Sequence, residues 1–117
     1  MIVETIFNSG INFENQERVI YKALTDATTA ENEEISELLI RRGVDVNYFD
    51  DSIKPPIIAA VYTGNINMTK MLLQHGADVE CAHMLGFTPL LAAVEIEDAD
   101  MINILLSYSE ATYLHLY

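Results

Sequence analysis

The sequence is poor in the residues on which several common functions depend. It has a single cysteine, Cys81, so no internal disulfide can form, and we expect a reducing compartment, the cytoplasm or the nucleus. Six lysine or arginine residues stand against eighteen aspartate or glutamate residues, which gives a formal net charge of −12. Binding to a phosphate backbone needs clustered basic side chains. This composition therefore argues against a nucleic-acid partner.

Long apolar runs are missing as well. No run approaches the ~18 residues that a helix needs to cross a bilayer, so we expect no membrane association. Residues 1–4 lack the basic region and the apolar stretch that begin a secretory signal, so none is expected. Half of the residues are nevertheless hydrophobic. The chain can therefore bury a core, and its 117 residues fit one domain.

The titratable residues form no recognisable catalytic or metal-binding pattern. The histidines are His75, His83 and His115. Cys81 and His83 make one short pair without further ligands at metal-binding spacing, and nothing indicates a base beside the thiol. There is no glycine-rich phosphate loop. We expect no enzymatic activity, no cofactor and no metal.

The chain does contain a period of 33 residues. Gly10, Gly43 and Gly76 follow this spacing, as do Pro56 and Pro89. A fixed period of 20 to 50 residues indicates stacked repeats, and each repeat buries its apolar face against its neighbour. The same spacing also relates Ala27, Ala60 and Ala93, and the pairs 39–40, 72–73 and 105–106.

Within one period the pattern predicts two helices and an extended hairpin. We expect a first helix over residues 56–63, a break at Gly64, and a second helix over residues 67–75 with apolar side chains at helical spacing. A glycine then supplies the left-handed residue that ends the helix. In the following period Thr88 is suited to cap a first helix, and the second helix is expected over residues 100–107.

Residues 86–93, GFTPLLAA, resemble the G-x-T-P-L-H-x-A start of an ankyrin repeat, and residues 72–79 and 39–47 resemble its end. The resemblance covers nearly the whole chain. It implies an all-α repeat solenoid, an ankyrin-repeat stack of helix-turn-helix units joined by β-hairpin-like loops. The expected single domain spans residues 1–117, with a partial repeat at 1–19 and repeats at 20–52, 53–85 and 86–117, the last degenerate.

The chain departs from the family pattern at two kinds of position. Thr25, Ile58 and Leu91 replace the histidine at the helix start, so we expect the hydrogen bonds that this histidine supports to be missing. Glu31 and Glu97 occupy the position of the glycine between the helices. In the first full unit the residues that normally start and end the helices are replaced together, so we expect this unit to be the least stable.

The resemblance places a partner on the concave surface made by the hairpin tips and the first helices. Apolar Met84, Leu85 and Phe87 there are typical of a protein interface, although Met84 and Leu85 folded back onto the neighbouring hairpin is an alternative. The predicted partner-binding residues are Tyr21, Asp51, Ser52, Lys54, Tyr62, Met84, Leu85, Phe87, Glu95 and Ile96.

The leading functional hypothesis is a non-enzymatic protein–protein interaction module, of the scaffold or inhibitor type. The acidic charge favours a partner protein with a basic patch. The alternative is a structural array segment that self-associates through exposed ends, as a homodimer or within a longer array. It is motivated by the apolar residues in segments 2–7 and 108–117.

Overall fold

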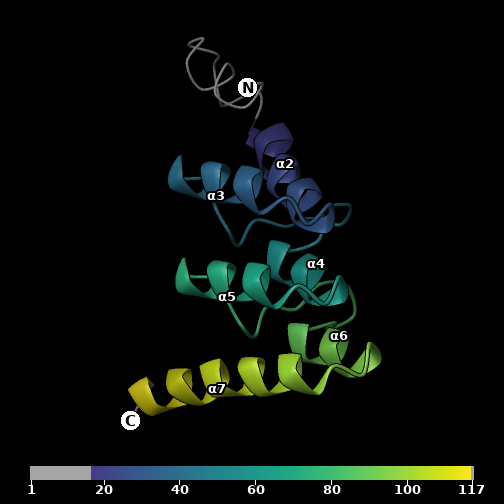
Figure 1. Ribbon diagram of the computed structural model, residues 1–117, viewed down its shortest axis with the longest axis vertical. Helices are drawn as coiled ribbons and strands as arrows, with labels where there is room; N and C mark the ends of the chain where they lie inside the picture. The colour runs from purple at the N-terminus through teal and green to yellow at the C-terminus, as the bar shows by residue number, and fades with distance from the viewer. Residues whose placement is uncertain (1–16, 117) are drawn as a thin grey trace.

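The computed structural model describes the backbone of residues 17–116 and the side chains of residues 18–110. The expectations for the partial repeat at 2–7, for Gly10 and for the side chains of the apolar tail lie outside this part. Pairs of helices are stacked along the long axis (Figure 1). They are α2 (Glu17–Thr29), α3 (Glu33–Arg41), α4 (Pro56–Tyr62), α5 (Ile66–Gln74), α6 (Pro89–Glu95) and α7 (Ala99–Leu116).

The same contacts recur from one pair of helices to the next. The first helices α2, α4 and α6 lie in one row, α2 against α4 and α4 against α6, and each also contacts its own second helix. Between the pairs, the extended segments contain two isolated bridges, Asp50 with Ile53 and His83 with Phe87. The expected all-α repeat solenoid is therefore confirmed.

The 33-residue period sets which side chains form the core. Leu39, Leu72 and Leu105 occupy equivalent places on the second helices and are all buried. Ala60 and Ala93 are fully buried on α4 and α6, where small side chains let neighbouring helices approach closely. Because each unit repeats the pattern, the core continues without interruption along the stack.

The turn between the two helices of each pair needs a left-handed residue. Gly64 supplies it with φ of 71°, and Glu31 and Glu97 adopt the same conformation with φ of 58° and 57°. Left-handed backbone costs a residue with a Cβ about 1–2 kcal/mol, so the two glutamates are strained. Asn65 then caps α5 by accepting a hydrogen bond from the Met68 amide at 3.0 Å.

The last helix is longer than expected. The pattern predicts its end near Ser107, but α7 has 18 residues and runs to Leu116, whereas α3 and α5 have nine each. The equivalent helices stop before Gly43 and Gly76, which adopt φ of 88° and 94°. Ser109 stands at that place, and a serine does not favour the left-handed turn. The helix therefore continues through it.

The expectation of lost hydrogen bonds at the helix starts is wrong for one unit. The Thr25 hydroxyl donates to the Lys54 carbonyl at 2.9 Å and so links the first unit to the second. A hydroxyl group can donate as an imidazole N–H does. Ile58 and Leu91, at the equivalent positions, have no polar group to do so.

None of the described helices is long and apolar enough to span a membrane.

Candidate protein-binding surface

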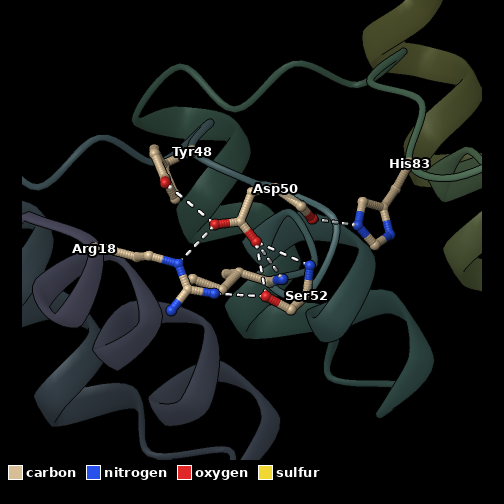
Figure 2. Close-up of polar contacts among 6 residues, drawn as sticks. Arg18, Tyr48, Asp50, Ser52 and His83 are labelled. Atoms are coloured by element: carbon tan, nitrogen blue, oxygen red, sulfur yellow. Dashed lines mark hydrogen bonds and ion pairs between the residues drawn. The ribbon is translucent and has the colours of Figure 1, made fainter.

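The first hairpin is held together by polar side chains around Asp50 (Figure 2). One carboxylate oxygen accepts hydrogen bonds from the Ser52 amide at 2.9 Å and the Ile53 amide at 3.0 Å. The other accepts from Arg18 Nε on α2 at 3.0 Å and from the Tyr48 hydroxyl at 3.3 Å. The carboxylate therefore closes its own turn and joins it to the first helix.

These contacts stabilise the charged form of Asp50. Hydrogen bonding from the Ser52 backbone, helped by the Arg18 guanidinium, lowers the pKa of the Asp50 carboxyl to about 2. The hairpin also contacts its neighbour in the next unit, since the His83 ring Nε2 lies 2.8 Å from the Asp50 carbonyl oxygen (Figure 2). The base of the second hairpin is therefore anchored to the first.

The second hairpin presents apolar side chains at its tip. His83 and Phe87 exchange backbone hydrogen bonds of 2.8 and 2.9 Å and close a loop of three residues. Met84, Leu85 and Gly86 in this loop all have positive φ, of 38°, 55° and 79°. The Met84 and Leu85 side chains are 63% and 108% exposed, so neither folds back onto the neighbouring hairpin. Two bulky residues are thus held in a strained conformation in contact with solvent.

A groove of about 480 Å³ lies between this tip and the first helices α4 and α6. The rings of Tyr62 and Phe87 stack in it, with centroids 5.5 Å apart and planes 13° from parallel. The Lys54 ammonium lies 5.3 Å from the centre of the Tyr62 ring, a cation–π contact. The groove is lined by Lys54, Ile58, Tyr62, His83, Met84, Leu85, Phe87 and Leu91.

Glu95 fixes the stacked rings of Tyr62 and Phe87 by a hydrogen bond at the edge of the groove. The Tyr62 hydroxyl donates to Glu95 Oε2 at 2.6 Å, across one full period of the repeat. This hydrogen bond to a carboxylate, together with desolvation, raises the pKa of the Tyr62 phenol. Tyr62 therefore stays neutral and fixed between Lys54, Phe87 and Glu95.

The structure gathers about half of the residues expected to bind a partner. Lys54, Tyr62, Met84, Leu85 and Phe87 line the groove, and Glu95 lies beside it through its hydrogen bond. The others lie elsewhere: Tyr21 stacks on Tyr48 at 4.3 Å, Asp51 and Ser52 belong to the first hairpin, and Ile96 is half-buried at the end of α6.

Sequence reasoning missed three residues of the groove, Ile58, His83 and Leu91. The period contains the signal for two of them. Ile58 and Leu91 stand at the family's histidine position, and apolar side chains there extend the lining of the groove. His83 follows Asp50 by one period, and its ring nitrogen contacts the Asp50 backbone.

The described residues offer no arrangement for metal or thiol chemistry. Among the side chains that the structure describes, those of residues 18–110, no group of three or more His, Cys, Asp or Glu is placed to hold a metal ion. Cys81 is buried, and desolvation, with a contribution from Asp78, raises the pKa of its thiol to about 11. A thiol that stays protonated near neutral pH is a poor nucleophile.

Comparison with known proteins agrees with the repeat architecture. Two overlapping matches to the family model described as "Ankyrin repeats (3 copies)" span residues 2–83 and 24–115, and together cover nearly the whole chain. A search of curated proteins gave no match. Because these matches cover far more than half of the chain, and the structure consists of stacked helix pairs, the chain belongs to the ankyrin-repeat family.

Proposed function

We propose that the chain is a non-enzymatic binding module that captures another protein in the groove between the second hairpin and helices α4 and α6. Arrays of ankyrin repeats generally mediate protein–protein interactions, which supports this kind of function. The observation that carries the site assignment is the strained, exposed tip of Met84 and Leu85 beside the stacked rings of Tyr62 and Phe87. Such a tip stabilises the free protein little.

The groove favours an apolar side chain of the partner. The rings of Tyr62 and Phe87 line it, and aromatic residues are enriched among those that dominate binding energy. Met84 adds a flexible thioether side chain that adapts its shape to what it contacts. An aromatic or long aliphatic side chain can lie between this tip and the stacked rings of Tyr62 and Phe87. This contact supplies the affinity.

The charge of the chain favours basic residues beside that apolar anchor. Eighteen acidic against six basic residues create a negative field that attracts a basic segment and accelerates its association. Glu95 is exposed beside the groove on α6, and Asp51 is exposed on the first hairpin. Binding of such a segment weakens as salt concentration rises. A scaffold and an inhibitor both fit this mode of capture.

The test is affinity capture with a matched pair of variants. Immobilised wild type, Leu85→Ser and Leu106→Ser are exposed to the same cell extract, and the retained proteins are quantified by mass spectrometry. Both leucines are exposed, but only Leu85 lines the groove. We expect the partner to be retained by wild type and Leu106→Ser and lost from Leu85→Ser.

Calorimetry with the purified partner then measures the size of the effect. A residue that dominates binding contributes at least about 2 kcal/mol, so Leu85→Ser should raise the dissociation constant about 30-fold. Unchanged circular dichroism shows that both variants fold. Capture by Leu85→Ser at the wild-type level contradicts the assignment of the groove.

A further inference from the structure

One repeat position that borders the groove differs in character from its two equivalents. Lys54 follows Tyr21 and precedes Phe87 by one period, so a cation stands where the neighbouring units have aromatic rings. Both aromatic residues stack on another ring of the chain. Lys54 instead lies over the Tyr62 ring, and it is the only lysine, arginine, aspartate or glutamate among the described residues that line the groove.

The Lys54 ammonium has no carboxylate partner, although eighteen acidic residues stand against six basic ones in the chain. The ion pairs between described side chains are Arg18–Asp50, Lys22–Asp26 and Arg41–Glu37. Lys54 is in none of them and is exposed. Its charge is therefore available to a group from another molecule.

The surrounding backbone fixes where this charge lies. Ile53 and Pro55, on either side of Lys54, are both buried. The Lys54 carbonyl accepts the hydrogen bond from the Thr25 hydroxyl at 2.9 Å. The Tyr62 ring then holds the ammonium 5.3 Å from its centre. A side chain ordered in this way loses less conformational entropy when it pairs with a ligand.

An apolar side chain that enters the groove removes water from the Lys54 ammonium. Covering a cation without giving it a hydrogen-bond acceptor is unfavourable, and the contact with the Tyr62 ring offsets this only in part. A carboxylate beside the entering side chain supplies both an acceptor and the opposite charge. The groove therefore favours an apolar side chain that is accompanied by an acid.

We propose that the segment captured in the groove carries an aspartate or glutamate next to its apolar anchor, and that this carboxylate pairs with Lys54. The inference rests on the proposed function, because the anchor must first occupy the groove. Lys54 then determines specificity: among segments with the same apolar anchor, it selects those with an acidic neighbour.

The acidic net charge of the chain acts over a longer range than this contact. At physiological salt, screening limits the interaction of exposed charges to about 8 Å, so distant carboxylates mainly favour basic residues farther along the segment. The ammonium and the carboxylate meet at about 3 Å, where their mutual attraction is strongest. The expected segment is therefore of mixed charge, with an acid at the anchor and basic residues beyond it.

The experiment starts from a phage-displayed library of short peptides with a fixed phenylalanine and randomised flanks, selected on the full chain. One selected peptide is then synthesised in two forms, with its acidic residue kept or replaced by the corresponding amide. Fluorescence anisotropy measures the dissociation constants of both forms for wild type, Lys54→Met and Lys70→Met. Methionine keeps an unbranched side chain over Tyr62 and removes the charge. Lys70 on α5 is the control, because it is exposed, lies outside the groove and is in none of the ion pairs above.

The selected peptides should be enriched in aspartate or glutamate beside the phenylalanine. Wild type should bind the acidic form at least about threefold more tightly than the amide form, which is the size expected for a partly exposed ion pair. Lys54→Met should bind the two forms equally, and Lys70→Met should keep the wild-type ratio. Unchanged circular dichroism shows that both variants fold.

This inference and the proposed function fail in different ways. Peptides that need both their phenylalanine and Leu85 of the chain, but bind equally in acidic and amide form, overturn the role of Lys54 and leave the groove in place. A preference for the acid that Lys54→Met retains, or that Lys70→Met loses to the same extent, overturns it as well. If Leu85→Ser binds every selected peptide as wild type does, both proposals are wrong.

Discussion

The two hairpins occupy equivalent places in successive repeats, yet their side chains have different roles. In the first, Asp50 accepts hydrogen bonds from its own turn and from Arg18 of α2, so its polar groups stabilise the stack. In the second, Met84 and Leu85 at the tip are exposed and contribute no comparable contact. The comparison shows that the same repeat position stabilises the stack in the first hairpin and is left exposed in the second, where the proposed function assigns it to recognition.

The two hairpins also differ in backbone strain. The first closes a two-residue turn through the Asp50–Ile53 bridge, and none of its described residues has positive φ. The second closes a three-residue loop whose members are all left-handed, including a methionine and a leucine. Strain of about 1–2 kcal/mol per residue persists only where surrounding structure enforces it. Here the paired backbones of His83 and Phe87 enforce it.

The largest effect is expected where the hairpins differ most in burial. Ile53 is 2% exposed, whereas its equivalent is Gly86, which has φ of +79° and open space where a Cβ would lie. Ile53→Ala should lower the free energy of unfolding by about 3 kcal/mol because it removes buried methyl groups and leaves a cavity. Urea denaturation followed by circular dichroism measures the loss.

Gly86→Ala is the matched substitution in the second hairpin. A Cβ meets no atom within 4 Å there, so only the left-handed conformation opposes it, at about 1–2 kcal/mol. A loss for Gly86→Ala equal to that for Ile53→Ala would show that both hairpins serve stability alike, and would remove the contrast between them.

A smaller effect, of opposite sign, is expected at the tip. Leu85→Gly relieves left-handed strain and removes no buried contact, while the more flexible glycine favours the unfolded chain by about 0.5–1 kcal/mol. The free energy of unfolding should therefore rise by about 0.5–1 kcal/mol. The same urea titration measures it, with Glu97→Gly on the turn before α7 as a positive control for strain relief.

Measuring partner capture by the same variant tests whether the tip serves binding. Under the proposed function, Leu85→Gly should stabilise the protein and weaken capture of the partner, a combination that a purely structural tip would not give. A variant that is less stable than wild type would mean that Leu85 makes a contact on which folding depends.

The period predicts those parts of the fold that depend on short-range signals. Thr88 caps α6, Gly76 ends α5 in a left-handed conformation, and Leu72 is buried at its expected place. The length of α7 was predicted wrongly because it depends on a missing stop signal. Replacing glycine by Ser109 removes the stop, but the residue itself does not indicate how far the helix continues.

The candidate groove was only partly predictable for a related reason. The family resemblance indicates which positions face the hairpin side, and this identified Met84 and Leu85, which line the groove. It does not indicate which side chains pair across units. The stacking of Tyr62 on Phe87 and of Tyr21 on Tyr48 depends on rotamers and on the distance between units, which no local pattern specifies.

The smallest predicted effect tests the polar hairpin through pH. The pKa of Asp50 is lowered to about 2, against about 3.9 in an unfolded chain, so its contribution is present above pH 4 and is lost as the pH falls toward 2. Urea denaturation of wild type and Asp50→Asn should show a stability difference at pH 6 that shrinks between pH 4 and pH 2. The effect is modest because the Arg18–Asp50 pair is largely exposed.

Raising the salt concentration distinguishes two contributions that lower the pKa of Asp50. The largest is the hydrogen bond from the Ser52 backbone, and the Arg18 guanidinium contributes less. Screening weakens an exposed ion pair but leaves a short backbone hydrogen bond largely intact. The difference between wild type and Asp50→Asn should therefore persist for the most part in 0.5 M NaCl. If this stability difference disappears in 0.5 M NaCl, the Asp50 carboxylate acts chiefly by attracting Arg18 of α2, and the turn of the first hairpin closes without its hydrogen bonds.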